Sequence, residues 1–315
     1  MFEYLDYIYE VYKERNFTRA AEKLFISQSS LSLTIKKAEQ QIGAEIFDRG
    51  SKPLSLTEFG KAYIAACEQV LALRSDLENH VYDLNHLQKG SISIGAGNFF
   101  ATYLVAPFLA EFKEEHPNIT VNLVEGRSMD LRVQLEKGDL DVLVTNADLT
   151  SPDLEREVLF SEQLLLTVPR GRIDPEGLEP IPPEALGTGP YTSYKPFDLK
   201  LVKSIPVVGL RPGNDTRLRT DLIYKAQGLR PTYLLEVDQS STAFNIACNQ
   251  AGVSVTADTV IRTLLRGRAV DVFYLDSPHA CRDVCAYTNV RKYRSKILER
   301  FLDEFPFYAK ARREY

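Results

Sequence analysis

The chain has 315 residues, a hydrophobic content of 44% and a formal net charge of −5. This length is sufficient for two or three domains, and the mean hydropathy of −0.21 is typical of a water-soluble globular protein, which argues against a membrane protein. The net charge excludes a protein covered with positive charge, so any surface for nucleic acid must be local. The amino-terminal segment contains acids and tyrosines and has no basic stretch followed by an uninterrupted apolar run. We therefore expect no signal peptide and a cytoplasmic location.

Residues 18–60 carry the pattern of a winged helix-turn-helix. Thr18 is a suitable N-cap for a first short helix, and Ser27 is a suitable N-cap for a second helix after a tight turn. The second helix has an apolar stripe at positions i, i+4, i+7 and i+11, formed by Leu31, Ile35, Ala38 and Ile42. The polar side chains that project away from this stripe are Gln28, Ser29, Ser32, Lys36 and Gln40. Such a face suits the major groove of DNA, where amides and hydroxyls meet base edges.

An ordinary amphipathic helix with a solvated polar face is the alternative, and the segment after the helix argues against it. Gly43 ends the helix, and residues 49–53 form a basic turn that would be the wing. Arg49 and Lys52 of this wing are placed to contact phosphates. Between Arg19 and Lys52 basic residues outnumber acidic ones, so positive charge is local and DNA affinity needs more than one such module.

The run FTRAAEKLFISQSSLSLTIKKAEQQIGAEIFDRGSKPLSLTEFG, residues 17–60, resembles the amino-terminal signature of LysR-type transcriptional regulators. The paired alanines, the Ser-Gln before the second helix, the Phe-x-Arg and the Leu-Thr-x-x-Gly are all in register. The resemblance implies a sequence-specific transcriptional regulator that is not an enzyme. Its implied partners are double-stranded operator DNA and, as a further candidate, RNA polymerase. The candidate DNA-binding residues are Thr18, Ser27, Gln28, Ser29, Ser32, Leu33, Lys36, Arg49 and Lys52.

Leu33 departs from the family pattern, which often has Arg or another long polar residue after Ser32. At about 100° per residue, Leu33 falls nearly opposite the buried stripe and is an exposed apolar side chain. It either contacts a thymine methyl group or is a neutral surface leucine, and single exposed leucines are common. If Leu33 contacts DNA, the operator should differ from those of relatives that carry Arg.

A long helix is predicted to follow Thr57 and to continue without a proline to about Leu87, before Gly90 ends it. Apolar residues recur by threes and fours as an a/d seam, which consists of Tyr63, Ala66, Val70, Leu73, Leu77, His80, Leu84 and Leu87. Because this seam has no partner inside a small domain, residues 61–89 are predicted to form a homodimeric coiled coil about 45 Å long. His80 is expected to set the register of the coil, with a pH-sensitive role as the alternative.

Beyond residue 90 predicted strands alternate with helices, as in a largely parallel sheet covered on both faces. The expected strands are 91–96, 119–124, 140–145, 164–168, 206–210, 233–237, 253–256, 269–275 and 284–287. The expected helices are 100–115, 131–137, 216–226, 242–250, 258–265 and 294–305. The fold class is therefore α/β, preceded by an all-α winged helix-turn-helix and a long linker helix.

Two phrases in this half, Leu135-Glu-Lys-Gly-Asp-Leu-Asp-Val142 and Ala251-Gly-Val-Ser-Val255, resemble the effector-binding half of LysR-type regulators. That half is similar to type 2 periplasmic solute-binding proteins, which implies two α/β lobes joined by crossing strands near residues 162–168 and 266–273. The implied domains are a DNA-binding domain (1–60), a linker helix (61–89), one effector-binding lobe (90–163 with 269–315) and a second lobe (164–268). The family commonly assembles tetramers through sensor contacts, so a homodimer or a homotetramer is expected.

Ligands of open α/β sheets bind beyond the carboxyl ends of strands, where helix amino termini offer N–H groups. This rule names the candidate effector-binding residues, which are Asn98, Phe99, Thr102, Arg127, Ser128, Thr145, Asn146, Arg211, Gly213, Asn214, Thr216, Ser240 and Thr256. Arg127 and Arg211 stand in corresponding loops of the two lobes, and an Arg can hold a carboxylate or phosphate with two hydrogen bonds. They favour an anionic metabolite as the small-molecule effector, with surface salt bridges as the alternative. Gly95-Ala-Gly97 does not indicate a dinucleotide fold, because the third glycine of that motif is missing.

Other classes of function explain less of the chain. A solute-binding transport protein without catalytic activity would account for the second half of the chain. Such a protein must be exported, which disagrees with the expected lack of a signal peptide. An enzyme is not supported, because no nucleophile elbow, paired-carboxylate motif or metal cluster stands at informative spacing, and no catalytic residue, cofactor or metal is assigned. Cys67, Cys248, Cys281 and Cys285 lack a metal-binding spacing, so free thiols are expected and a redox-sensing regulator remains as an alternative. The effector, the operator and the direction of regulation stay open.

Overall fold

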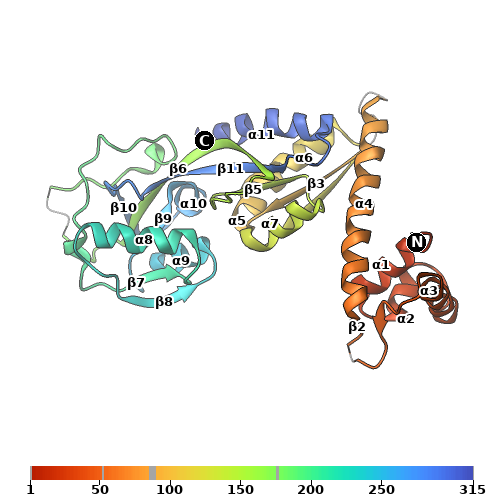
Figure 1. Ribbon diagram of the computed structural model, residues 1–315. Coiled ribbons are helices and arrows are strands. Elements are labelled where there is room, and N and C mark those ends of the chain that lie inside the picture. Colours follow the sequence, from red (N-terminus) through yellow and green to blue (C-terminus); the bar gives the residue numbers. More distant parts are fainter. Residues whose placement is uncertain (1, 52, 85–89, 175–176, 315) are drawn as a thin grey trace. The chain divides into compact units, whose positions relative to one another are not determined.

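The computed structural model describes residues 2–51, 53–84, 90–174 and 177–314 (Figure 1). The chain forms two compact units, and each is described by itself. Unit 1 comprises Met1–Glu78 with Lys137–Asp139, and unit 2 comprises Asn79–Glu136 with Leu140–Tyr315. Within the described ranges, no helix combines the length and the apolar character needed to cross a membrane.

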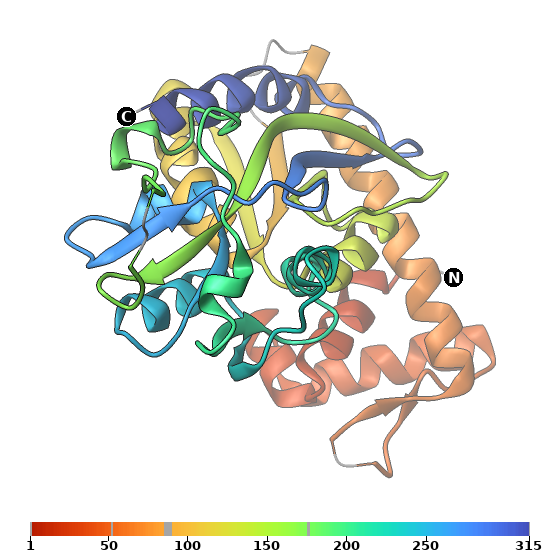
Figure 2. The ribbon, with the colours of Figure 1, turned by 90° about the vertical axis from the view of Figure 1, so that its left-hand side faces the viewer.

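Unit 1 is a small helical domain with a two-stranded hairpin, which Figure 2 shows projecting from the helices. Its elements are α1 (Leu5–Glu14), α2 (Phe17–Lys23), α3 (Gln28–Ile42), β1 (Phe47–Asp48) and β2 (Ser55–Leu56), followed by the start of α4 (Glu58–Leu84). β1 and β2 pair antiparallel. The core of the unit includes Ile8, Val11, Leu31, Ile35 and Phe47, each at most 1% exposed. The predicted winged helix-turn-helix is confirmed, with α1 as an additional helix.

The two helices of the motif begin at different kinds of cap. Asn16, and not Thr18 as expected, is the N-cap of α2, because its side-chain oxygen accepts the backbone N–H groups of Thr18 and Arg19 at 2.8 and 3.1 Å. Ser27 caps α3 as predicted, and its hydroxyl accepts the backbone N–H of Ser30 at 3.1 Å. An amide oxygen just before the helix thus satisfies two free N–H groups of the first turn, which leaves Thr18 inside the helix.

Helix α4 begins at the predicted place. The Thr57 hydroxyl accepts the backbone N–H of Gly60 at 2.9 Å, so Thr57 satisfies a free donor of the first turn. The structure describes α4 as far as Leu84, and the predicted end at Leu87 lies outside the described residues.

The predicted seam of α4 divides into two parts. Tyr63 is only 4% exposed because it packs into the core of unit 1, so here the seam has a partner in its own chain, contrary to expectation. Leu73 and Leu77 are 68% and 66% exposed. Of the seam side chains that the structure describes, the exposed leucines therefore lie in the later turns of the helix.

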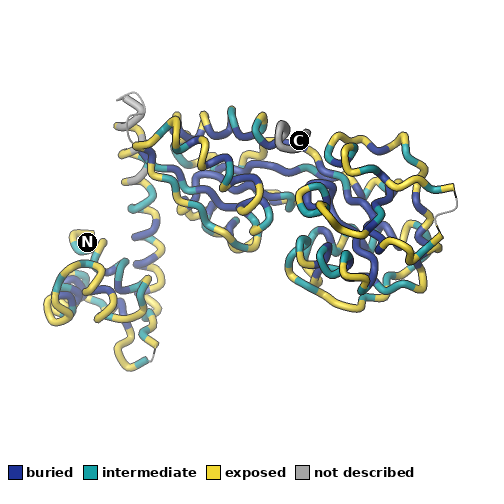
Figure 3. Tube along the Cα trace, turned by 180° about the vertical axis from the view of Figure 1, so that it is seen from behind, coloured by how far each residue is buried: buried dark blue, intermediate teal, exposed yellow. Residues whose placement is uncertain are grey.

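The first lobe of unit 2 is a mostly parallel sheet with helices packed on it. Its elements are β3 (Gly90–Ala96), α5 (Asn98–Phe100), a π-helical turn (Ala101–Val105), α6 (Ala106–Glu115), β4 (Ile119–Glu125), α7 (Ser128–Lys137), β5 (Val142–Thr145) and α11 (Lys296–Glu314). β3 pairs in parallel with both β4 and β5. The buried strands stand out in Figure 3, and their core includes Ile94, Val105, Phe108, Phe301 and Phe305.

The second lobe has its own sheet and core. Its elements are β7 (Val207–Leu210), α8 (Asp215–Ala226), β8 (Tyr233–Val237), α9 (Ser240–Cys248), β9 (Ser254–Ala257), α10 (Asp258–Leu264) and β10 (Val270–Phe273). β7 and β8 pair in parallel. Residues 177–206 carry two short 3-10 turns, Pro183–Ala185 and Leu199–Val202, and place Tyr191 and Phe197 in the core.

Two long strands pair antiparallel, and the first of them has residues in the cores of both lobes (Figure 1). β6 (Leu154–Pro169) pairs with β11 (Cys281–Asn289) over its first part and with β9 and β10 over its last part. The main sheet has the order β10-β6-β11-β5-β3-β4. The expected strand 164–168 is thus the end of a longer one. Its earlier part was missed because it carries several charges, as an exposed strand edge does.

The chain returns to the first lobe later than expected. Val270, Val272 and Phe273 of β10 pack in the core of the second lobe, together with Leu275 and Ala280. The return therefore occurs at about the start of β11 and not at residue 269. An apolar strand can pack in either lobe, and its partner, the end of β6, decides which.

Candidate DNA-binding and effector sites

The solvent-facing side of α3 carries most of the predicted DNA-reading residues. Gln28, Ser29, Leu33 and Lys36 are exposed, and Ser32 is half-buried. On the opposite side, Leu31, Ile35 and Ala38 are at most 2% exposed. The helix therefore presents one polar face with a single leucine in it.

Two other candidates near α3 also have local structural roles. The Ser27 hydroxyl caps α3 and shares a hydrogen bond with the Ser29 hydroxyl at 3.0 Å. Thr18 is exposed in the first turn of α2, where its backbone N–H is taken by Asn16. The Asn16 and Ser27 side chains thus already accept backbone N–H groups in the first turns of the two helices.

Glu39 ties the wing to α3, and sequence reasoning missed it. Its carboxylate is 8% exposed and accepts the backbone N–H groups of Ile46 and Phe47 at 2.8 and 3.2 Å. The Arg49 guanidinium donates to the same carboxylate at 2.9 Å and lies 5.5 Å from the ring of Phe17. Arg49 therefore helps to position the wing, and its charge is partly compensated. Lys52, the other predicted wing contact, lies outside the described residues.

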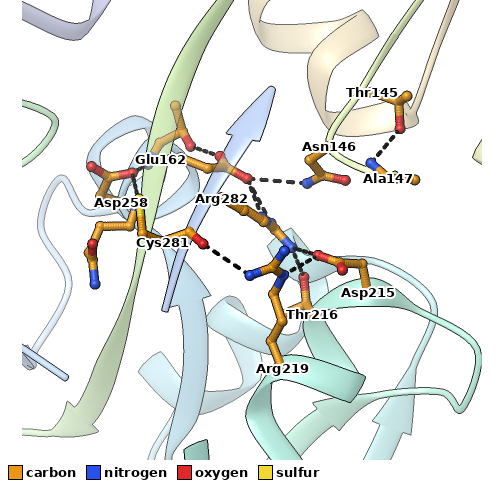
Figure 4. Close-up of polar contacts among 12 residues, drawn as sticks. Thr145, Asn146, Ala147, Glu162, Asp215, Thr216, Arg219, Asp258, Cys281 and Arg282 are labelled. Carbon is orange, nitrogen blue, oxygen red and sulfur yellow. Dashed lines mark hydrogen bonds and ion pairs between the residues drawn. The ribbon is translucent and has the colours of Figure 1, made fainter. Parts of the chain in front are cut away.

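A buried ionic network lies where β6 and β11 run between the lobes (Figure 4). Arg282 on β11 donates through Nε to Glu162 on β6 at 2.8 Å, and their side chains are 4% and 1% exposed. Through Nη1 the same guanidinium donates to Asp215 and to the Thr216 hydroxyl, both at 2.8 Å, at the start of α8. Burial disfavours the charged guanidinium, but the two carboxylates outweigh this cost and raise the pKa of Arg282 above its usual value.

The Glu162 carboxylate also joins the two lobes. It accepts the Nδ2–H of Asn146, which follows β5, at 3.1 Å, and the hydroxyl of Thr259 on α10 in the second lobe. Arg219 donates to Asp215 at 2.8 Å, so two arginines face two carboxylates and the network has no net charge. It links side chains of both lobes, and its own charges balance.

The remaining predicted lining residues lie on both sides of this network. The Ser128 and Thr145 hydroxyls are 2.7 Å apart, and Thr145 also accepts the backbone N–H of Ala147 at 3.0 Å. Phe99 contacts both lobe cores. Asn98 and Thr102 of the first lobe are exposed. In the second lobe, Gly213 has a φ of +90°, Asn214 is the N-cap of α8, and Ser240 begins α9. The hydroxyl of Thr256 is buried and lies 3.1 Å from the Ser254 hydroxyl. Thr256 is thus taken up by the core of the second lobe.

Arg127 and Arg211 approach the same carboxylate. Arg127 follows β4 in the first lobe and donates to Asp238 Oδ1 at 3.4 Å, while Arg211 Nε lies 3.5 Å from Asp238 Oδ2. The two arginines are 79% and 63% exposed, and Asp238, which follows β8, is 50% exposed. The surface ion pair considered as the alternative is present, and one carboxylate serves both cations.

Sequence reasoning missed the charged members of the network: Glu162, Asp215, Arg219 and Arg282. Its rule selected residues in loops after strands, whereas Glu162 and Arg282 lie within strands. A signal existed for Glu162, which is a charged residue two positions before the apolar run Leu164-Leu-Leu166. Buried charges are usually paired, so each predicts a partner elsewhere in the chain.

One group of side chains has the composition of a metal site. Glu115 and His116 at the end of α6 and Glu304 on α11 each offer a ligand atom within 4.8 Å of the others. Glu304 already accepts a hydrogen bond from Arg300 at 2.8 Å, and Glu115 is exposed. Arg300 therefore satisfies the charge that a cation would otherwise meet, and the group carries no metal assignment.

The cysteines do not form a ready redox pair. Cys281 and Cys285 lie four residues apart on β11, about 13 Å at the rise of a strand, whereas a disulfide needs Cα atoms within about 7 Å. Burial raises the pKa of Cys285, and it raises the pKa of Cys67 to about 11. Both thiols are therefore protonated and weakly nucleophilic near neutral pH.

Family comparisons cover both halves of the chain. The description "Bacterial regulatory helix-turn-helix protein, lysR family" matches residues 2–61, and "LysR substrate binding domain" matches residues 85–306. An uncharacterized HTH-type transcriptional regulator of Bacillus subtilis, YcgK, is 28% identical over 82% of this chain and 80% of its own length. A probable RuBisCO transcriptional regulator of Trieres chinensis is 25% identical over 92% of this chain and 91% of its own.

Solved structures share the fold at lower identity. A full-length OxyR variant from Pseudomonas aeruginosa has a TM-score of 0.70 at 22% identity, covering 98% of this chain and 95% of that one. Full-length CbnR in complex with its target DNA has a TM-score of 0.65 at 18% identity, covering 98% and 99%. Because family descriptions match both the helix-turn-helix and the two-lobed domain, this chain belongs to the LysR family of DNA-binding transcriptional regulators and carries the family's effector-binding domain.

Proposed function

We propose that this regulator acts on operator DNA in the cytoplasm and is controlled by a small anionic metabolite that binds between the two lobes of unit 2. One observation carries the choice of an anion. Arg127 from the first lobe and Arg211 from the second already share the carboxylate of Asp238, at 3.4 and 3.5 Å. A carboxylate or phosphate of an effector would satisfy the same two guanidinium groups with shorter, bidentate hydrogen bonds.

Neighbouring groups would orient the rest of the effector. Ser128 and Asn146 follow strands of the first lobe, Thr145 is the last residue of β5, and the three offer hydroxyl and amide groups. The ionic network around Arg282 has equal numbers of positive and negative groups, so it provides no net attraction for an anion. Selectivity for charge would therefore come from Arg127 and Arg211.

Effector binding would control the DNA-binding unit by changing how the lobes pack against each other. β6 and β11 connect the lobes, and a ligand that binds one arrangement more tightly shifts the population toward it. The size of the response is limited by the difference in affinity for the two arrangements. An enzyme is not proposed, because family membership and the DNA-binding motif point to regulation.

We also propose that the regulator assembles as a homodimer through α4, with a homotetramer as the higher assembly. Leu73 and Leu77 are 68% and 66% exposed and stand four residues apart along this helix. Apolar side chains at such spacing are buried in coiled coils by a second helix. A dimer would place two winged helices on one operator, which compensates for the low net charge of each.

Calorimetric titration with a panel of organic acids, amino acids, sugar phosphates and uncharged sugars tests the effector proposal. We expect the tightest ligand to be an anion, and the double variant Arg127→Ala/Arg211→Ala to lose most of that affinity. Arg300→Ala is the matched control, because it removes an equally charged, 48% exposed guanidinium from α11. If a neutral or cationic compound binds best, or the double variant binds as well as Arg300→Ala, the anion assignment is wrong.

A further inference from the structure

Leu33 stands at the centre of the exposed face of α3. At about 100° per residue it lies opposite the buried stripe of Leu31 and Ile35, and its side chain is 69% exposed. Residues three, four and seven positions away share its side of the helix, among them Ser29, Lys36 and Gln40, all exposed. One apolar side chain is thus surrounded by groups that form hydrogen bonds.

This placement restricts what Leu33 can recognise. A leucine has no donor or acceptor, so it cannot bond the O6 and N7 atoms of guanine, as Arg or Lys would. The thymine C5-methyl group is the apolar feature that the major groove presents. A leucine gains by removing its own surface and the methyl group from water, and its side chain has no polar group that must be desolvated for this contact.

A second exposed apolar residue on the same motif provides a comparison. Phe25 is 96% exposed in the turn between α2 and α3, with φ of +55°. It is not part of the polar face of α3, because it precedes the helix cap Ser27. Phe25 thus matches Leu33 in apolar character and in exposure, and differs in its place relative to the groove-facing side of α3.

We infer that Leu33 reads a thymine methyl group in the major groove, which makes it a residue that determines operator specificity. The inference rests on DNA binding by α3, which family membership supports. Replacing the methyl-bearing thymine by deoxyuridine removes only the methyl group from the DNA. The loss expected for one methyl group withdrawn from contact is about fourfold in affinity.

The test uses the full-length protein. Selection from a library of random duplexes defines the operator, and deoxyuridine then replaces each thymine of that operator, one position at a time. For the unmodified protein we expect one position, with its symmetric mate in a palindrome, to lose about fourfold in affinity. Leu33→Ala should bind the thymine and deoxyuridine duplexes equally at that position, and Leu33→Arg should select guanine there. Phe25→Asn keeps a residue that tolerates positive φ, and it should retain the full methyl discrimination.

Three results are distinguishable. If no deoxyuridine position separates the unmodified protein from Leu33→Ala, and both select the same operator, Leu33 is a neutral surface residue and the inference is overturned. If Phe25→Asn loses the discrimination as Leu33→Ala does, the effect is not specific to Leu33 and the inference is also overturned. If selection enriches no sequence, sequence-specific binding by α3 fails, and the inference fails with it. Because Leu33 is exposed, unchanged melting temperatures of the variants verify that they are folded.

Discussion

The Arg282 and Glu162 side chains form an ion pair that is almost completely shielded from water, at 4% and 1% exposure. Neither group could be buried alone, because an isolated charge in the protein interior is strongly destabilising. Asn146, Thr259 and Asp215 supply the remaining hydrogen bonds from both lobes. At the scale of single residues, this network supplies polar contacts between the two lobes.

Removing one member of the pair should therefore be costly. We expect Arg282→Met to lower the free energy of unfolding by about 3–5 kcal/mol, because it leaves the Glu162 carboxylate buried without a cation. Adding Glu162→Gln should recover part of the loss, since the second change removes the orphaned charge. Urea unfolding followed by circular dichroism measures both effects.

The control for this experiment is Arg300→Met, which removes an ion pair with Glu304 that is 48% and 34% exposed. Exposed pairs contribute about 1 kcal/mol or less, so this variant should unfold almost like the unmodified chain. A loss for Arg282→Met no larger than that of the control would show that the buried pair does not hold the lobes.

At the scale of elements, the apolar residues of α4 fall into two groups, one buried and one exposed. Ile64 and Cys67 pack into the core of unit 1, and Tyr63 does so as well. Further along, Leu73 and Leu77 are exposed in the single chain. Apolar residues thus recur every three or four positions along the whole helix. In the first turns they are buried within the chain, and in the later turns they are exposed.

Carboxylates placed in the exposed seam should disrupt assembly. We expect Leu73→Asp/Leu77→Asp to shift the protein to a monomer in sedimentation equilibrium and to weaken operator binding, because two charges would face their copies across the coil. Lys61→Asp lowers the net charge by the same two units at an exposed position of α4 that lies about 120° and 160° around the helix from Leu73 and Leu77, so it should keep the assembly. Persistence of the dimer in the first variant would show that another surface is the main contact.

At the scale of the whole molecule, the carboxylate of Asp238 occupies the position proposed for the effector anion. An internal carboxylate that pairs with Arg127 and Arg211 must be displaced before an external one can bind both. The pairs are 50–79% exposed, so the competition is weak. This competition nevertheless allows a second test of the proposal, in which removing a charge should strengthen effector binding instead of weakening it.

Asp238→Asn should strengthen anion binding by up to about fivefold, because the competitor loses its charge while its size is kept. Titration of the variant with the tightest ligand of the panel measures the change. Asp271→Asn is a suitable control, since Asp271 on β10 pairs with Arg170, far along the sequence from both arginines. A weaker affinity for Asp238→Asn would mean that Asp238 helps to bind the effector and that the ligand is not a simple anion.

The sequence alone determined the local structure. The apolar stripe of α3, the cap at Ser27, the start of α4 and most strands and helices of the two lobes follow from patterns over a few residues. Such patterns reflect side-chain periodicity and backbone donors that must be satisfied nearby. The family signature in residues 17–60 also depends only on neighbouring positions, so the amino-acid sequence is sufficient to predict the DNA-binding function.

Tertiary structure decided everything that joins distant parts of the chain. Arg282 meets Glu162 across 120 positions, and Asp238 meets Arg127 across 111. Strand β10 belongs to the second lobe because it pairs with the end of β6. A side chain's own neighbours show that it is charged or apolar, but its partner is set by which strands cross and in what register. The pairing and register of the strands depend on packing the whole sheet. The apolar surface that is buried depends on the combined arrangement of all strands, and no single segment specifies that arrangement.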